Sequence, residues 1–152
     1  MAPKNKDDIS IYLGLTCIPG REKYFSDCIK SLINQKKTAK KIFISYCENY
    51  VRFKDQHFDE KLIDEFKNEP VVEFIKLQED KGPATKFLAP WPRIKELEKN
   101  NLENCHLIVC DDDRNYCDFF VEHFTNLISQ DDDVVYTGYI DILNKEKGFN
   151  LI

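Results

Sequence analysis

Three adjacent aspartates, Asp111, Asp112 and Asp113, follow the apolar run His106–Cys110 and are well suited to metal chemistry. Neighbouring carboxylates repel one another unless a cation or protons relieve them. In an extended segment, Asp111 and Asp113 would point to one side and Asp112 to the other. That side would offer two hard oxygen ligands, which suit Mg²⁺ or Mn²⁺ bridging the phosphates of a nucleotide.

A second acidic triplet, at residues 131–133, precedes an apolar run instead of following one. Ligands of a parallel sheet bind beyond the carboxyl ends of the strands, so this triplet would lie at the wrong edge. We interpret residues 131–133 as a solvated loop. A solvated loop is also the alternative interpretation of Asp111–Asp113.

The segment Asp80-Lys81-Gly82-Pro83-Ala84-Thr85-Lys86 has the composition of an anion-binding turn. Gly82 permits a tight turn, and Pro83 can open a helix whose free N–H groups favour an anion. Lys86 could reach a phosphate, and Asp80 could accept a hydrogen bond from a base N–H or a ribose hydroxyl. The alternative is an ordinary helix start with a solvated lysine.

Further polar residues follow two other apolar runs. The loop Thr16-Cys17-Ile18-Pro19-Gly20-Arg21 leads straight into a helical segment, and Arg21 could form a bidentate phosphate contact or be an exposed helix-start residue. Glu48 could bind ribose hydroxyls or cap a loop. Trp91, framed by two prolines, could line a sugar subsite, although a hydrophobic clamp is the simpler interpretation.

Strands and helices are predicted to alternate along the chain. Apolar runs rich in β-branched residues predict strands at Ile9–Thr16, Lys41–Cys47, Val71–Leu77, His106–Cys110 and Val134–Ile140. Apolar residues at helical spacing lie between them, within residues 25–33, 62–66, 94–97 and 120–128. This order predicts an α/β fold with a doubly wound, mostly parallel sheet. Residues 55–58 and 90–92 are the predicted exposed loops.

Length, net charge and cysteine content exclude several classes of protein. The 152 residues fit one domain, and the net charge of −5 argues against a nucleic-acid partner, which would favour a basic stripe. The six cysteines form no CxxC pair, and the N-terminus has no apolar stretch for a signal peptide. No run reaches the roughly 18–20 apolar residues of a membrane span. We therefore expect a reduced, cytoplasmic protein.

Taken together, three segments resemble those of the GT-A glycosyltransferases: Thr16–Arg21, Asp80–Lys86, and the apolar strand running into Asp111–Asp113 with Tyr116 shortly beyond. The chain is similar to short bacterial and large-DNA-virus members with an Asp-x-Gly-Pro-Ala-Thr-Lys segment and a triple-aspartate form of the DxD motif. Order and spacing match over residues 9–140. The sequence departs from the family at Lys81, where an aromatic residue is common, and at Arg114, where an aliphatic one is usual.

The resemblance implies the Rossmann-like nucleotide-binding half of a GT-A fold, a nucleoside-diphosphate-sugar donor and Mn²⁺ or Mg²⁺. We favour a UDP-sugar. The residues that it implies as contacts of the nucleotide sugar are Thr16, Ile18, Pro19, Arg21, Glu48, Asp80, Lys86, Asp111 and Asp112. It implies Asp113 as the direct metal ligand, with Asp111 beside it.

The expected activity is transfer of the sugar to a hydroxyl of a glycan or protein acceptor, with inversion. Relatives continue into an acceptor-binding half that supplies the carboxylate deprotonating this hydroxyl. We expect residues 1–152 to be a single nucleotide-sugar-binding domain without most of that half. The chain would then be either a fragment, or a minimal protein whose site is completed by a second copy or another chain. Asp141 is the late carboxylate nearest the last predicted strand; we assign no catalytic residue. A viral chain would act in the host cytoplasm.

Two other classes stay open. The domain could bind a nucleotide or a partner without turnover. A Mg²⁺-dependent phosphotransferase or nucleic-acid enzyme also places paired aspartates after a buried strand. Donor hydrolysis without an acceptor would argue against the first of these alternatives.

Overall fold

The structure is a computed structural model that describes residues 4–99 and 101–130. Its elements are β1 (Ser10–Thr16), α1 (Glu22–Ile33), β2 (Lys41–Asn49), α2 (Lys61–Phe66), β3 (Val72–Glu79), η1 (Gly82–Ala84), α3 (Thr85–Leu88), α4 (Pro90–Glu98), η2 (Leu102–Asn104), β4 (Cys105–Val109) and α5 (Phe120–Gln130). The four strands predicted within these residues are confirmed, with ends that differ by no more than two residues. The strand predicted at residues 134–140, the triplet at 131–133 and Asp141 lie outside the described residues.

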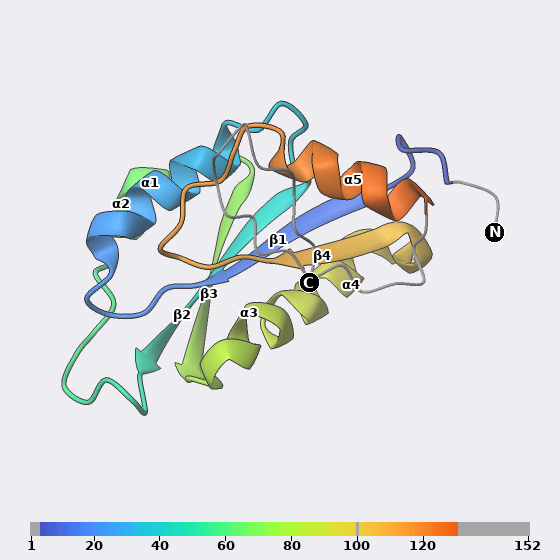
Figure 1. Cartoon of the computed structure of the whole chain (residues 1–152). Helices are drawn as coiled ribbons and strands as arrows, with labels where there is room; N and C mark the ends of the chain where they lie inside the picture. The colour runs from blue at the N-terminus through green and yellow to red at the C-terminus, as the bar shows by residue number, and fades with distance from the viewer. Residues whose placement is uncertain (1–3, 100, 131–152) are drawn as a thin grey trace.

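The strands form one parallel sheet in the order β3-β2-β1-β4 (Figure 1). Helices α1, α2 and α5 cover one face of the sheet, and α3 and α4 cover the other (Figure 1). The predicted α/β, Rossmann-like fold is confirmed. Because the chain runs from β1 through β2 to β3 and then crosses to the other side of β1, strand order reverses between β1 and β4. Ligands of such sheets bind beyond this switch point.

The larger core lies between the sheet and helices α1 and α5. Alternate residues of β1 and β2 point into it, as expected for strands. On this face the two strands contribute Ile11, Leu13, Leu15, Ile42 and Ile44, all buried. The helices add Phe25, Ile29, Leu32, Phe120, Val121, Phe124 and Ile128.

The opposite face holds a smaller core of Tyr12, Phe43 and Ile94, in which the two aromatic rings stack with centroids 5.8 Å apart. Helix α4 packs here, and its first turn contains the prolines at 90 and 92. The prediction of an exposed loop at 90–92 is therefore wrong. Proline suits the start of a helix because the first N–H groups have no partner within the helix.

The loop predicted at 55–58 is a loop, but Phe58 is buried. Its ring stacks on Tyr46 with centroids 4.6 Å apart. Aromatic burial of this kind anchors the loop to β2. Within the described residues, no helix is both long and apolar enough to cross a membrane.

Candidate functional site

The three aspartates lie beyond β4, at the switch point of the sheet, and Asp112 and Asp113 form a turn. Nη1 of Arg21 lies 2.9 Å from Oδ1 of Asp112 and 3.0 Å from Oδ2 of Asp113. Asp111 instead pairs with Nζ of Lys86. The predicted alternation, with Asp111 and Asp113 on one side, is therefore wrong, because the segment turns instead of continuing as a strand.

Asp112 is the buried member of the triplet, with 3% of its surface exposed. Its Oδ2 accepts the N–H of Ile18 at 3.4 Å, while its Oδ1 accepts from Arg21. Burial raises the pKa of Asp112, and the hydrogen bonds from Arg21 and Ile18 oppose this shift. Asp112 therefore ties the loop after β1 to the loop after β4.

Asp111 and Lys86 form the second ion pair of the site. The hydrogen bond and charge of Lys86 lower the pKa of Asp111, although partial burial opposes the change. Tyr116 holds the backbone of Asp111 because its hydroxyl accepts the Asp111 N–H at 2.7 Å and donates to the Asp111 carbonyl at 3.1 Å. The Cys28 thiol donates to the same carbonyl at 3.3 Å.

The segment that follows β3 is held by Asp80. Its Oδ1 accepts the Gly82 N–H at 2.8 Å and lies 3.4 Å from the Thr85 hydroxyl, which also accepts the Lys81 N–H at 3.0 Å. Gly82 has a φ of 64°, which glycine adopts readily. The helix that Pro83 was expected to open begins as the 3-10 turn η1 and continues as the four-residue α3. Lys86, and not a helix N-terminus, therefore brings positive charge to the site.

The loop that follows β1 is largely enclosed. Thr16 and Pro19 are buried, and Ile18 is half-buried. The hydroxyl of Thr16 has no hydrogen-bond partner among the described residues, and neither has that of Ser45, its register partner on β2. The Tyr50 hydroxyl donates to the Cys17 carbonyl at 2.7 Å, which fixes the loop against the end of β2.

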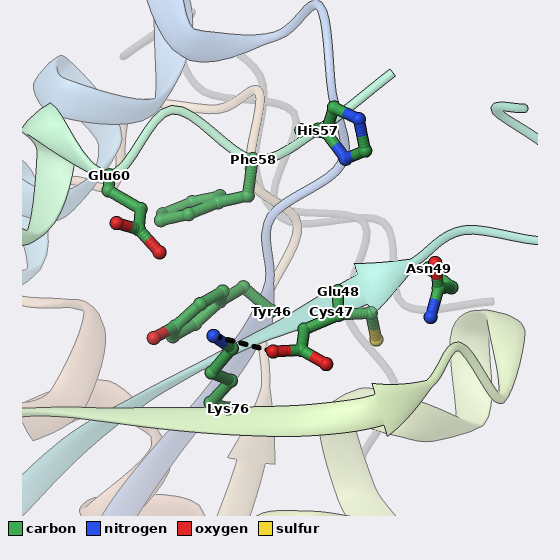
Figure 2. Close-up of a pocket in the computed structure, with 8 residues that line it drawn as sticks. All are labelled: Tyr46, Cys47, Glu48, Asn49, His57, Phe58, Glu60 and Lys76. Atoms are coloured by element: carbon green, nitrogen blue, oxygen red, sulfur yellow. Dashed lines mark ion pairs between the residues drawn. The ribbon is translucent and has the colours of Figure 1, made fainter. Parts of the chain in front are cut away.

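Glu48, at the end of β2, lies apart from the ion pairs of the aspartates. It pairs with Lys76 at 2.8 Å, and both residues line a pocket of about 560 Å³. Figure 2 shows this ion pair beside the facing rings of Tyr46 and Phe58. The remaining lining residues are Cys47, Asn49, His57 and Glu60.

Trp91 packs against the smaller core and stacks on Phe87 with centroids 6.2 Å apart. This contact supports the interpretation of Trp91 as a hydrophobic clamp.

The sequence analysis did not identify two residues near the aspartates: Cys28, which contacts the Asp111 carbonyl, and Gly14, which lies in β1. A glycine inside a predicted strand was a usable signal for Gly14, since it often marks close approach of another backbone.

Among the residues that the structure describes, no three or more His, Cys, Asp or Glu side chains form a metal-binding group. The aspartate oxygens are paired with Arg21 and Lys86 instead. All six cysteines are free.

No protein-family model matches the sequence, and no curated protein matches it significantly. Among solved structures, the chain is similar to S. aureus TarS 1–349, a glycosyltransferase, in complex with UDP, with a TM-score of 0.52 and 12% identity. The similarity covers 80% of this chain and 32% of the TarS chain. The structure of TarS 1–349 in complex with UDP-GlcNAc matches with a TM-score of 0.49 and 14% identity over 80% and 32% of the two chains.

The similarity to the UDP complex of TarS shows a shared fold. The sheet described here is an α/β, Rossmann-like sheet of the kind found in that glycosyltransferase. This chain spans about a third of the length of the TarS chain that it matches.

Proposed function

We propose that this chain forms the donor-nucleotide-binding half of a metal-dependent glycosyltransferase. The observation that carries the proposal is the convergence of Arg21 and Lys86 on Asp111–Asp113 at the switch point of the sheet. Open parallel sheets bind their ligands at this place. The donor in this proposal is a nucleoside-diphosphate sugar, with UDP as the favoured nucleotide, and the acceptor is a hydroxyl of a glycan or protein.

Arg21 and Lys86 would receive the diphosphate. The planar guanidinium of arginine matches phosphate oxygens well, and lysine provides a compact positive charge. Both cations are paired with carboxylates. A diphosphate would compete with those carboxylates for the cations, which would release oxygen atoms of Asp111 and Asp113.

The donor set fits Mn²⁺ or Mg²⁺, which prefer carboxylate oxygens. The side chains of Asp111 and Asp113 are 58% and 40% exposed, whereas both oxygens of buried Asp112 are occupied. Asp113 and Asp111 would therefore hold the ion, and Asp112 would keep Arg21 in position. When bound, the ion would supply charge neutralisation for the leaving diphosphate.

The nucleoside would lie toward the ends of β1, β2 and β3. Thr16, Ile18 and Pro19 lie in the loop after β1, Glu48 lines the pocket at the end of β2, and Asp80 follows β3. The pocket volume of about 560 Å³ lies within the usual size range for small-molecule sites. The enclosed loop would contribute apolar surface, and Glu48 and Asp80 would accept hydrogen bonds from the ribose or base.

The structural similarity supports this proposal because the TarS structure with the same fold was solved in complex with UDP. The inverting course and the cytoplasmic location belong to the same proposal. The resemblance of the motifs to GT-A glycosyltransferases implies the first, and the second is an expectation from the composition of the sequence.

Calorimetric titration with UDP, GDP and dTDP, each with and without Mn²⁺, tests the proposal. We expect one nucleotide to bind at micromolar concentration in the presence of Mn²⁺, and Asp113→Ala to abolish this binding. Asp64→Ala is the matched control, because Asp64 is an exposed carboxylate of α2 that pairs with Lys67. Failure of the wild type to bind any of the three nucleotides would overturn the proposal.

The second proposal is a domain that binds the nucleotide without turnover. Each of the three aspartates already contacts a cation, so this cluster presents no carboxylate free to act as the base. Hydrolysis of the donor in the presence of Mn²⁺ would exclude binding alone. Binding of the nucleotide without hydrolysis would favour it.

A further inference from the structure

Gly14 lies in the middle of β1, a strand that is paired on both sides. A glycine there weakens a strand because it loses more backbone freedom on folding and offers no side chain to pack. The structure shows why a glycine occupies this position. A Cβ atom at this position would lie 2.3 Å from the carbonyl oxygen of Lys86 and 3.3 Å from Cδ1 of Leu107.

The close approach at Gly14 is between two backbones. The Lys86 carbonyl belongs to α3, which has only four residues and cannot yield as a flexible side chain would. The N-terminal end of α3 is fixed as well, because the Thr85 side chain is fully buried and hydrogen-bonds the turn at Lys81. Any side chain at position 14 would therefore push α3 away from the sheet.

Gly14 also contacts the strand that carries the aspartates. Its carbonyl accepts the N–H of Cys110 at 2.9 Å, and Cys110 immediately precedes Asp111. Because Gly14 has no side chain, the backbone of α3 lies directly against its α-carbon. Its carbonyl hydrogen-bonds the start of the loop after β4. These two elements carry Lys86 and Asp111, and the Lys86 side chain is only 16% exposed beside its partner.

We propose that Gly14 is a positioning residue, whose bare α-carbon lets α3 lie close enough to the sheet to set Lys86 against Asp111. This inference rests on the proposed function, in which Lys86 receives the diphosphate of the donor. The helix and the aspartate loop are placed relative to each other by one residue of the central strand. Gly14 itself touches no substrate in this proposal.

Acetylation of the folded protein with an amine-reactive acetate ester, followed by mass spectrometry, tests the positioning without any nucleotide. In the wild type, we expect Lys86 to react more slowly than Lys81, whose side chain is 59% exposed. In Gly14→Ala, we expect Lys86 to lose this protection and to react nearly as fast as Lys81. Continued protection of Lys86 in folded Gly14→Ala would overturn the proposal.

Leu13→Val is the matched control, because Leu13 is fully buried on the opposite face of the same strand. It weakens the packing of β1 without placing an atom near α3, so Lys86 should stay protected. If Leu13→Val exposed Lys86 equally, general loosening of β1 would explain the result and the proposal would be wrong.

A double-mutant cycle then links Gly14 to the ligand. Gly14→Ala, Lys86→Met and the double variant are titrated with UDP and with uridine in the presence of Mn²⁺. We expect Gly14→Ala to weaken UDP binding, to leave uridine binding unchanged and to cause no further loss in Lys86→Met. Fully additive losses for UDP would contradict the proposal.

The two experiments separate the inference from the proposed function. Absence of UDP binding to the wild type would contradict the proposed function. The acetylation rate of Lys86 would still test whether Gly14 positions Lys86. If Gly14→Ala does not fold, Thr85→Val removes the hydrogen bond that fixes the start of α3 and leaves the sequence of β1 unchanged. Lys86 should then lose its protection, and a fully protected Lys86 would show that the placement of α3 does not control it.

Discussion

Nη1 of Arg21 lies 2.9 Å from Oδ1 of Asp112 and connects the loops that follow two neighbouring strands, β1 and β4. The pair is asymmetric, because Arg21 is half-buried whereas Asp112 is 3% exposed. A buried carboxylate that loses its partner keeps the cost of desolvation. The pair therefore holds the site together as well as supplying charge to it.

Arg21→Met should lower the free energy of unfolding by about 1–3 kcal/mol, since it leaves Asp112 buried without its cation. The partial exposure of Arg21 places the effect toward the lower end of this range. Urea unfolding at neutral pH measures it. Arg52→Met is the control, because Arg52 is exposed and its guanidinium lies over the ring of Phe53 in a cation–π arrangement. Equal stability losses in the two variants would contradict this prediction.

The pair of Lys86 and Asp111 should make stability depend on pH. Lys86 lowers the pKa of Asp111 below its ordinary value of 3.8 in the folded state. The pair therefore contributes its full stability above pH 3.8, and this contribution is lost as the pH falls through the lower, folded-state pKa. Urea unfolding of the wild type and Lys86→Met from pH 6 to pH 2 should show a difference that shrinks at the acidic end. A difference that stays constant would refute this assignment.

Tyr116→Phe should lower the free energy of unfolding by about 1 kcal/mol per hydrogen bond lost, because the hydroxyl serves both backbone groups of Asp111. It should also weaken Mn²⁺-dependent nucleotide binding, since the turn of the aspartates loses its support. Urea unfolding and calorimetry measure the two effects. Tyr24→Phe removes an exposed hydroxyl from α1 and should change neither. If Tyr116→Phe changed neither stability nor nucleotide binding, the hydrogen bond from Cys28 would be sufficient to hold the backbone of Asp111.

Thr16→Val separates stability from binding. The Thr16 hydroxyl is buried and has no partner within the described residues, so replacing it with a methyl group of similar size should leave stability unchanged or raise it by about 1 kcal/mol. If Thr16 contacts the nucleotide, as the sequence analysis predicts, affinity for the nucleotide should fall at the same time. A loss of stability on this substitution would reveal a hydrogen bond of the hydroxyl in the folded protein.

The buried thiols should be unreactive in the folded protein. Burial raises the pKa of Cys28 to about 12 and that of Cys47 to about 11. Since the thiolate is the nucleophile, alkylation by iodoacetamide at pH 8 should be slow until the chain unfolds. Mass spectrometry with and without urea measures this protection. Rapid labelling of Cys28 in the native protein would indicate that α1 separates readily from the aspartate loop.

The local pattern of apolar residues in the sequence is sufficient to predict the fold class. Apolar β-branched runs predict the strands of a parallel sheet because each buried strand must be apolar on both faces. Helical spacing between the runs predicts the crossovers, and the parallel order places every following loop at one edge. The convergence of Arg21, Lys86 and Asp111–Asp113 at the switch point follows from this geometry and was predictable as a neighbourhood.

Which charges pair was decided by the tertiary structure. The turn at Asp112 and Asp113 breaks the alternation of an extended strand, and whether Arg21 or a metal ion meets those carboxylates depends on how closely two distant loops approach. The same holds for Phe58, which is buried in the larger core with its ring stacked on Tyr46. Gly14 was visible in the sequence as an anomaly of a strand, but its meaning depends on the carbonyl of Lys86, 72 residues further along the chain. Periodicity is a local property of the chain, whereas such contacts depend on the packing of elements that are distant in sequence.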